Sequence, residues 1–282
     1  VKDIFPGSDD SHPFYLTNTN GTLFFTASNG LNGTELWKSD GTSGGTSIVK
    51  DINSGAGSSN PTNLILMAGT LYFSATDGAG TNSGFELWKS DGTSGGTTQV
   101  KDIYVGALSS SPGNFAVANG TLFFAATDST GNELWKSDGT SLGTTQVKDI
   151  FASGALSSNP ANLTALGTTL LFTANDGSSG IELWKSDGTA VGTTQVKEIY
   201  SGASSANPSN FVVFNSTLYF SAQDGTNGYE LWKSDGTTGG TSLVQDIYSG
   251  STGSNPQYLT VLGNELFFAA SDSTNGNELW KL

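Results

Sequence analysis

The 282-residue chain contains no cysteine, no arginine and a single histidine, His12. Without cysteine it has no disulfide, no thiolate nucleophile and no cysteine-ligated zinc site. Charged residues make up only 13 % of the chain, and 25 acidic against 11 basic residues give a net charge of −14. A surface of that sign disfavours nucleic acid and anionic membranes as partners. No apolar run approaches the roughly 18 residues that a membrane-spanning helix needs, so no such helix is predicted.

An internal repeat dominates the chain. The tripeptide Glu-Leu-Trp recurs every 47 to 51 residues and contains all six tryptophans, which are Trp37, Trp88, Trp135, Trp184, Trp232 and Trp280. Within a repeat, short apolar runs alternate with Gly, Asn, Asp and Ser, a pattern typical of strands and turns. In the fourth repeat the expected strands are 162–166, 169–174, 181–185 and 193–199. Bulky apolar side chains at successive positions, as in 23–25, predict a second strand covered on both faces and therefore stacked sheets.

Repeats of about 40 to 50 residues with four antiparallel strands are typical of β-propeller blades. We therefore predict an all-β, six-bladed β-propeller with four antiparallel strands per blade, forming one domain over residues 1–282. The expected blades are 13–52, 61–103, 112–150, 160–199, 208–247, and 256–282 together with 1–4. The last repeat ends after its third strand, and 1–4 matches the fourth strand of the other repeats. The amino-terminal strand is therefore predicted to join the carboxyl-terminal blade and close the ring.

The octapeptide Glu-Leu-Trp-Lys-Ser-Asp-Gly-Thr begins at Glu35, Glu86, Glu133, Glu182 and Glu230. It resembles the ELWxxDGT repeat of bacterial secreted or surface-associated proteins, and the resemblance covers essentially the whole chain. This likeness implies an extracellular or cell-surface location and brings no agreed activity. The Ser-Asp-Gly hairpin is also similar to the Asp-box turn of sialidases and other propellers, but it lacks the spacing and the trailing aromatic residue of that motif.

Charged residues follow the repeat as well. If the third and fourth strands pair Trp37 with Ile48, Glu35 and Lys50 face each other across the ladder and form an ion pair. Asp40 and its counterparts in the Ser-Asp-Gly turns are expected to accept backbone N–H bonds within their own turns. The alternative, for these turns and for the Asp-containing loops between second and third strands, is calcium. Calcium needs several more oxygen ligands than the pattern supplies, so we predict neither a metal site nor a cofactor.

The sequence offers little for catalysis. His12 stands before Pro13 in a polar stretch, and no Ser-His-Asp, His-Glu-x-x-His or phosphate-binding loop pattern is present. Sialidases grip the substrate carboxylate with arginines, which this chain lacks. Paired carboxylates for glycoside hydrolysis stay formally open, but near-identical repeats supply like environments where such a pair needs unlike ones. We therefore predict that the protein is not an enzyme.

An aromatic residue follows the fourth strand in five repeats, with Asn53 in the remaining position, and the five are Phe5, Tyr104, Phe151, Tyr200 and Tyr248. Each opens a Gly/Ser-rich loop that crosses to the next repeat, where its ring either plugs the seam between repeats or binds a ligand. On these residues the sequence predicts an extracellular, non-catalytic interaction or structural module that binds a protein partner or self-associates through a propeller face. The alternative is a multivalent carbohydrate-binding propeller, a lectin with repeated inter-blade sites. The expected partner is a protein or glycan at the cell surface, with no nucleic acid and no membrane insertion.

Overall fold

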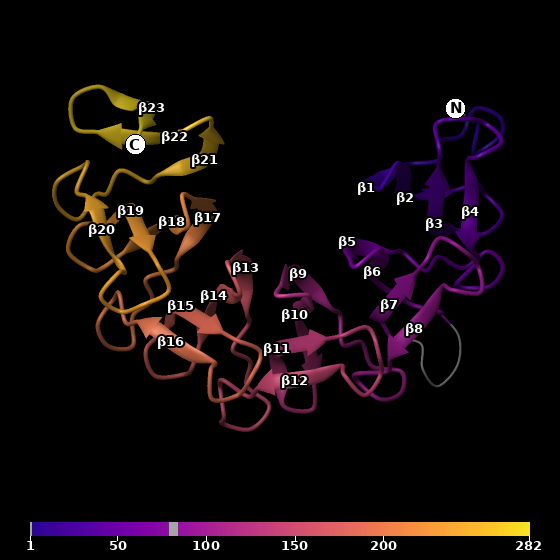
Figure 1. Ribbon diagram of the computed structural model, residues 1–282, viewed down its shortest axis with the longest axis horizontal. Coiled ribbons are helices and arrows are strands. Elements are labelled where there is room, and N and C mark those ends of the chain that lie inside the picture. The colour runs from indigo at the N-terminus through magenta and orange to yellow at the C-terminus, as the bar shows by residue number, and fades with distance from the viewer. Residues whose placement is uncertain (1, 79–83) are drawn as a thin grey trace. The chain divides into compact units, whose positions relative to one another are not determined.

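The computed structural model describes residues 2–78 and 84–282 (Figure 1). Within those ranges every regular element is a β-strand. In the same part of the chain, no helix is long and apolar enough to cross a membrane. The expected all-β class is therefore confirmed.

The strands form six antiparallel sheets, each built from strands that are consecutive in the chain. The first sheet contains β1 (Phe14–Thr19), β2 (Thr22–Ser28), β3 (Thr34–Ser39) and β4 (Ser47–Lys50). The second contains β5 (Thr62–Met67), β6 (Thr70–Ala75), β7 (Glu86–Ser90) and β8 (Thr98–Lys101). The third contains β9 (Gly113–Ala118), β10 (Thr121–Asp128), β11 (Gly131–Ser137) and β12 (Thr145–Lys148).

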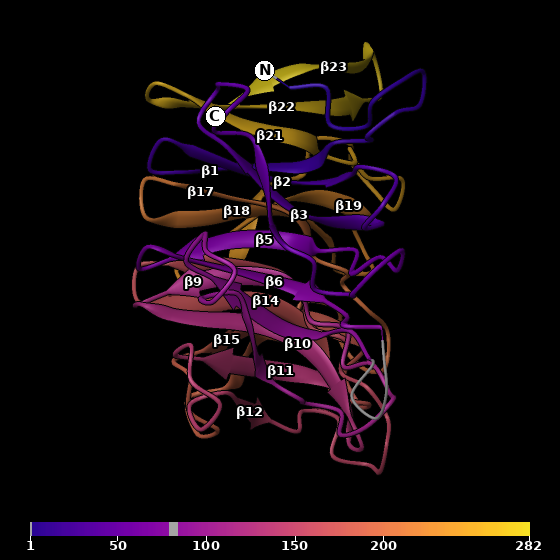
Figure 2. The same cartoon turned by 90° about the vertical axis from the view of Figure 1, so that its right-hand side faces the viewer.

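The remaining sheets repeat this order. The fourth contains β13 (Ala161–Leu166), β14 (Thr169–Asn175), β15 (Ile181–Ser186) and β16 (Thr194–Lys197). The fifth contains β17 (Ser209–Phe214), β18 (Thr217–Gln223), β19 (Tyr229–Ser234) and β20 (Ser242–Gln245). The last contains β21 (Gln257–Leu262), β22 (Glu265–Asp272) and β23 (Gly276–Lys281), which Figure 2 shows side by side in yellow.

The four strands expected in the fourth repeat are confirmed, although the last ends at Lys197 and not at Ile199. The fourth strand expected for the last sheet is not shown. Lys2 to Ile4 are not part of a strand, the last sheet has three strands, and Val1 lies outside the described residues. The structure therefore shows repeated antiparallel sheets, and the closed ring stays a prediction.

The chain divides into two compact units. One comprises 1–115, 120–129 and 135–145, and it contains the first two sheets. The other comprises 116–119, 130–134 and 146–282, and it contains the last three sheets. The strands of the third sheet contribute residues to both. That residues 1–282 form a single domain stays a prediction.

Two kinds of turn set the strand order. Between β1 and β2, Asn20 and Gly21 both have positive φ, 51° and 93°, as a two-residue type I′ hairpin requires. Between β3 and β4, Asp40 Oδ1 accepts hydrogen bonds from the Thr42 N–H at 2.9 Å and from Thr42 Oγ1 at 2.7 Å. A Cβ at Gly45 would lie 1.9 Å from Asp40 Oδ1, so only glycine fits against this turn. The expected role of Asp40 is confirmed.

The core lies between neighbouring sheets within each unit. In the first unit, Phe24 and Leu36 of the first sheet share one buried cluster with Phe73 and Trp88 of the second. A similar cluster joins the fourth and fifth sheets around Phe220 in the second unit. Because successive residues of the second strand point to opposite faces, each must meet its own cover. The expected cover on both faces is confirmed in the fourth sheet, where Leu171 and Phe172 of β14 are both 0 % exposed.

Candidate functional site

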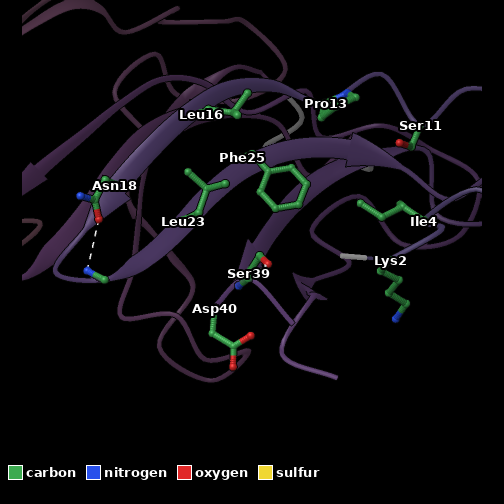
Figure 3. A pocket seen from close by; sticks show the side chains of 12 residues that line it. Lys2, Ile4, Ser11, Pro13, Leu16, Asn18, Leu23, Phe25, Ser39 and Asp40 are labelled. Atoms are coloured by element: carbon green, nitrogen blue, oxygen red, sulfur yellow. Dashed lines mark hydrogen bonds between the residues drawn. The ribbon is translucent and has the colours of Figure 1, made fainter. Parts of the chain in front are cut away.

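The first sheet carries a hollow of about 500 Å³ on one face (Figure 3). Its lining is largely apolar: Leu16 of β1 and Leu23 and Phe25 of β2 turn toward the same space as Ile4 of the amino-terminal segment. Asp40 of the β3–β4 turn lies at its edge. An apolar floor with a few polar groups at the rim is typical of a surface that takes a ligand or a partner.

The matching face of the second sheet is covered. There Leu71 and Asp91, at positions equivalent to those lining the first hollow, share a smaller hollow of about 310 Å³ with Phe24 and Lys38 of the first sheet. Lys38 Nζ spans this seam and donates to Gly92 O at 2.8 Å. On the second sheet, the face equivalent to this hollow is packed against the preceding sheet. On the first sheet the same face is open.

A buried glutamate lies in each of the first five sheets. Glu35, Glu86, Glu133, Glu182 and Glu230 are all 0 % exposed. In the first sheet the carboxylate accepts hydrogen bonds from the Ile52 N–H at 3.0 Å, from the Ser59 N–H at 2.9 Å and from Ser59 Oγ. These donors belong to residues 51–61, which join β4 to β5; such a segment between consecutive sheets is here called a connector. Each buried glutamate thus fastens the connector to its own sheet.

Burial changes the acidity of these glutamates. Loss of solvation raises the pKa of Glu35 to about 6 and that of Glu182 to about 7, while the hydrogen bonds to the carboxylates act in the opposite direction. Glu35 has a serine hydroxyl among its donors. At the equivalent position of the fourth connector stands Ala206, which offers Glu182 only its N–H, at 3.1 Å. Nearby Glu198 adds a further repulsion that raises the pKa of Glu182.

The predicted ion pair between Glu35 and Lys50 is wrong. Lys50 Nζ donates to Thr97 O of the second sheet at 2.8 Å. A β-bulge between Leu36 and Trp37 shifts the register, so that Leu36 and not Glu35 lies opposite Lys50. The equivalent lysines Lys101, Lys148 and Lys197 donate in the same way to Thr144 O, Thr193 O and Thr241 O. These lysines therefore tie one sheet to the next within each unit.

The five aromatic residues predicted to bind a ligand, Phe5, Tyr104, Phe151, Tyr200 and Tyr248, are all half-buried. For three of them a glycine of the following repeat lies under the ring. A Cβ at Gly30, Gly177 or Gly225 would come within 2.3 to 2.5 Å of Phe5, Phe151 or Tyr200. This contact favours the role of a seam plug for those three rings, and ligand binding by the five stays a prediction.

Three aspartates of the loops between second and third strands, Asp176, Asp224 and Asp272, also close their own turns. In the fourth sheet, Asp176 Oδ1 accepts hydrogen bonds from the N–H groups of Ser178 and Ser179, both at 2.8 Å. Part of the corresponding loop after Asp77 falls in 79–83, outside the described residues. Across the rest of the chain, no three acidic, histidine or cysteine side chains gather as a metal site would require.

His12 lies on the surface. It is exposed, adopts a left-handed backbone conformation with φ 46°, and precedes Pro13 at the start of the first sheet. Asn60 and Asn159 adopt the same conformation before the equivalent prolines. The histidine therefore occupies a position that the repeat uses structurally, and the absence of enzymatic activity stays a prediction.

No known protein family and no curated protein matches the chain. Solved structures do match. A puromycin hydrolase is 15 % identical, with a TM-score of 0.55, over 94 % of this chain and 42 % of its own. Oligopeptidase B from Leishmania major is 13 % identical, with a TM-score of 0.56, over 99 % of this chain and 39 % of its own. A puromycin-hydrolysing peptidase of Mycobacterium tuberculosis is 11 % identical, with a TM-score of 0.56, over 98 % and 42 %.

These comparisons correct the predicted function. The sequence predicts a non-catalytic interaction module, or else a lectin, whereas the solved structures that share the fold are peptidases. The predicted function as a non-catalytic interaction module or lectin is therefore wrong. The chain spans about two fifths of the length of those structures, and the matching part is their propeller domain. The likeness shows the fold alone: the repeated antiparallel sheets of this chain are of the β-propeller type.

Proposed function

We propose that the chain is the propeller part of a peptidase-type enzyme, where it admits and orients peptide substrates while bond cleavage takes place outside it. The observation that carries the proposal is the likeness of nearly the whole chain, 94 to 99 %, to the propeller parts of several peptidases. Its own side chains support the division of labour. The single histidine is exposed, and the buried glutamates of the first five sheets are engaged with backbone donors.

The test uses the purified chain and an uncharged, unstructured peptide of about ten residues with a fluorophore and a quencher at its ends. We expect fluorescence anisotropy to detect weak, saturable binding of a singly labelled version, with no rise in fluorescence from cleavage of the quenched version. A folded protein of similar acidity serves as the control for non-specific association. Absence of binding, or cleavage that copurifies with the chain, contradicts the proposal.

We also propose the finer architecture, a six-bladed ring in which the amino-terminal strand completes the last blade. Two observations support it. The last sheet has three strands where the others have four. Leu279 on β23 is 76 % exposed, although the equivalent leucines of the first five sheets, Leu36, Leu87, Leu134, Leu183 and Leu231, are at most 1 % exposed. A closed ring covers this leucine and removes a free sheet edge, which otherwise invites aggregation.

We also propose that the protein is extracellular or at the cell surface, and that it is related to ELWxxDGT repeat proteins. The octapeptide recurs in five of six repeats, and its Ser-Asp-Gly-Thr part builds the turn between third and fourth strands. Fractionation of the cells that produce the protein tests the location: recovery from the medium or the cell surface agrees with it, and recovery from the cytoplasm contradicts it.

A further inference from the structure

We propose that Glu278 on β23 binds the amino-terminal segment 2–13 of its own chain, accepting hydrogen bonds from the Ile4 N–H, the Ser11 N–H and Ser11 Oγ. This inference rests on the closed ring proposed for the fold and names the residues that hold it. The positions follow from the repeat: Ile4 and Ser11 match Ile52 and Ser59, and Glu278 occupies the glutamate position of its Glu-Leu-Trp.

The segment 2–13 already contacts the first sheet in the manner of a connector. Lys2 Nζ donates to Thr46 O at 3.2 Å, as Lys50 donates to Thr97 O one repeat later. The Ser28 N–H donates to Ser11 O at 2.9 Å, as the Thr76 N–H donates to Ser59 O at 3.1 Å. The ring of Phe5 lies over a glycine of the next loop, as Phe151 and Tyr200 do in the connectors that follow the third and fourth sheets. The side of the segment that faces the first sheet is therefore complete.

On the other side of the segment, the Ile4 N–H, the Ser11 N–H and Ser11 Oγ have no acceptor among residues 2–78 and 84–282. In the first connector, the corresponding N–H groups of Ile52 and Ser59 and the Ser59 hydroxyl all donate to Glu35. Three further connectors, those of the second, third and fifth sheets, repeat this set with Ser110, Ser158 and Ser254, whose hydroxyls lie 2.6 Å from their glutamates. Donors that lose water without gaining an acceptor cost free energy, so this side is built to meet a carboxylate.

Glu278 is the carboxylate that lacks these donors. It is exposed, whereas the five equivalent glutamates are 0 % exposed. Its neighbour Leu279 is exposed in the same way. The two carboxylate oxygens on one side can accept all three donors on the other, two N–H groups and one hydroxyl, as Glu35 does in the first connector. Because both belong to one polypeptide, their effective concentration favours the same chain over a second copy.

The test is a double-mutant cycle on the full chain, with Glu278→Gln, Ser11→Ala and the two combined. We expect each single change to lower the melting temperature by roughly 3 to 6 °C and the pair to lower it little further, since both remove the same contact. The Glu35→Gln and Ser59→Ala cycle gives the reference coupling. Glu265→Gln combined with Ser11→Ala is the matched control, which we expect to be additive.

Hydrogen exchange separates this inference from the ring itself. If β23 amides that face away from β22 are protected but Glu278→Gln and Ser11→Ala are additive, the ring stands and the role of Glu278 is overturned. If those amides exchange freely and the cycle is additive, the closed ring and the role of Glu278 are both overturned. A coupling that grows with protein concentration assigns the contact to a second copy and overturns the same-chain proposal.

Discussion

At the scale of single residues, the most informative feature is a carboxylate buried among backbone donors. Glu182 accepts hydrogen bonds from the N–H groups of Ile199, Tyr200 and Ala206, at 2.8, 3.2 and 3.1 Å. Backbone donors stabilise a carboxylate without supplying a full positive charge, so the loss of solvation is only partly offset. Such a group makes the stability of the fold depend on pH.

The sign of that dependence follows from the pKa. Glu182 has a pKa of about 7 in the folded protein against an ordinary value of 4.5, so the folded state binds the proton more tightly. Its contribution to stability is full below about pH 4.5 and is lost as the pH rises through about 7. We expect Glu182→Gln to flatten the pH dependence of the unfolding free energy over that range, measured by urea unfolding. Asp9→Asn, at an exposed site, should leave the slope unchanged, and an equal slope in both variants contradicts the account.

In the fourth repeat, a substitution can be made that lowers the pKa of Glu182 and stabilises the fold. Ala206 stands where the other four connectors with a buried glutamate carry serine, namely Ser59, Ser110, Ser158 and Ser254. Ala206→Ser supplies the missing hydroxyl donor to Glu182. We expect the pKa of Glu182 to fall and the unfolding free energy at pH 7 to rise by about 1 kcal/mol, a typical net gain for one hydrogen bond. Side-chain NMR titration and urea unfolding check this; an unchanged pKa refutes it.

At the scale of elements, two neighbouring glycines in the turn between third and fourth strands differ in the space available for a side chain. A Cβ at Gly45 would meet Asp40, while one at Gly44 meets nothing within 4 Å. We expect Gly45→Ala to destabilise the protein by about 1 to 3 kcal/mol because the Asp40 turn must move. Gly44→Ala should stay within about 0.5 kcal/mol of the parent protein. Thermal unfolding of the two variants measures these changes. Equal losses of stability in both would contradict the described contact between Gly45 and Asp40.

Much of the element structure could be predicted from the sequence because the signals repeat. Asn-Gly at residues 20–21 is a strong hairpin signal, and Ser-Asp-Gly fixes the next turn, so strand positions follow within one or two residues. The binding of the connector by Glu35 could not be predicted from the expected register of the third and fourth strands. The bulge after Leu36 removes the two-residue period on which the Glu35–Lys50 pairing rests. A signal did exist: a serine follows Glu35, Glu86 and Glu230 by 24 residues, and one follows Glu133 by 25.

The aromatic positions show the same limit for the candidate site. Phe5 and Tyr200 are recognisable in the sequence as residues that open a connector, but the sequence does not say what lies beneath their rings. Gly30 and Gly225, 25 residues later, are the partners. Packing between repeats depends on how consecutive sheets stack, which a pattern within one repeat does not encode. For the same reason, the sequence pattern does not indicate the open hollow beside Phe25.

At the scale of the whole molecule, neighbouring sheets within each unit cover one another, and lysines and glutamates hold them together. Lys50 donates forward to the second sheet, and Glu35 holds the connector that leads to it. Sheets that each hide one face of a neighbour are stable only as an array, so the first and last sheets need partners. A ring supplies both partners at once.

A disulfide tests this closure most directly, because the chain has no cysteine of its own. Leu36 lies opposite Lys50 in the first sheet, so the equivalent pair across the closing seam is Leu279 and Lys2. In Lys2→Cys/Leu279→Cys, the account predicts an intrachain disulfide on mild oxidation, a monomer in solution and a higher melting temperature than the reduced form. Lys2→Cys/Val261→Cys is the control that should keep free thiols. Free thiols or interchain dimers in the first variant would contradict the closed ring.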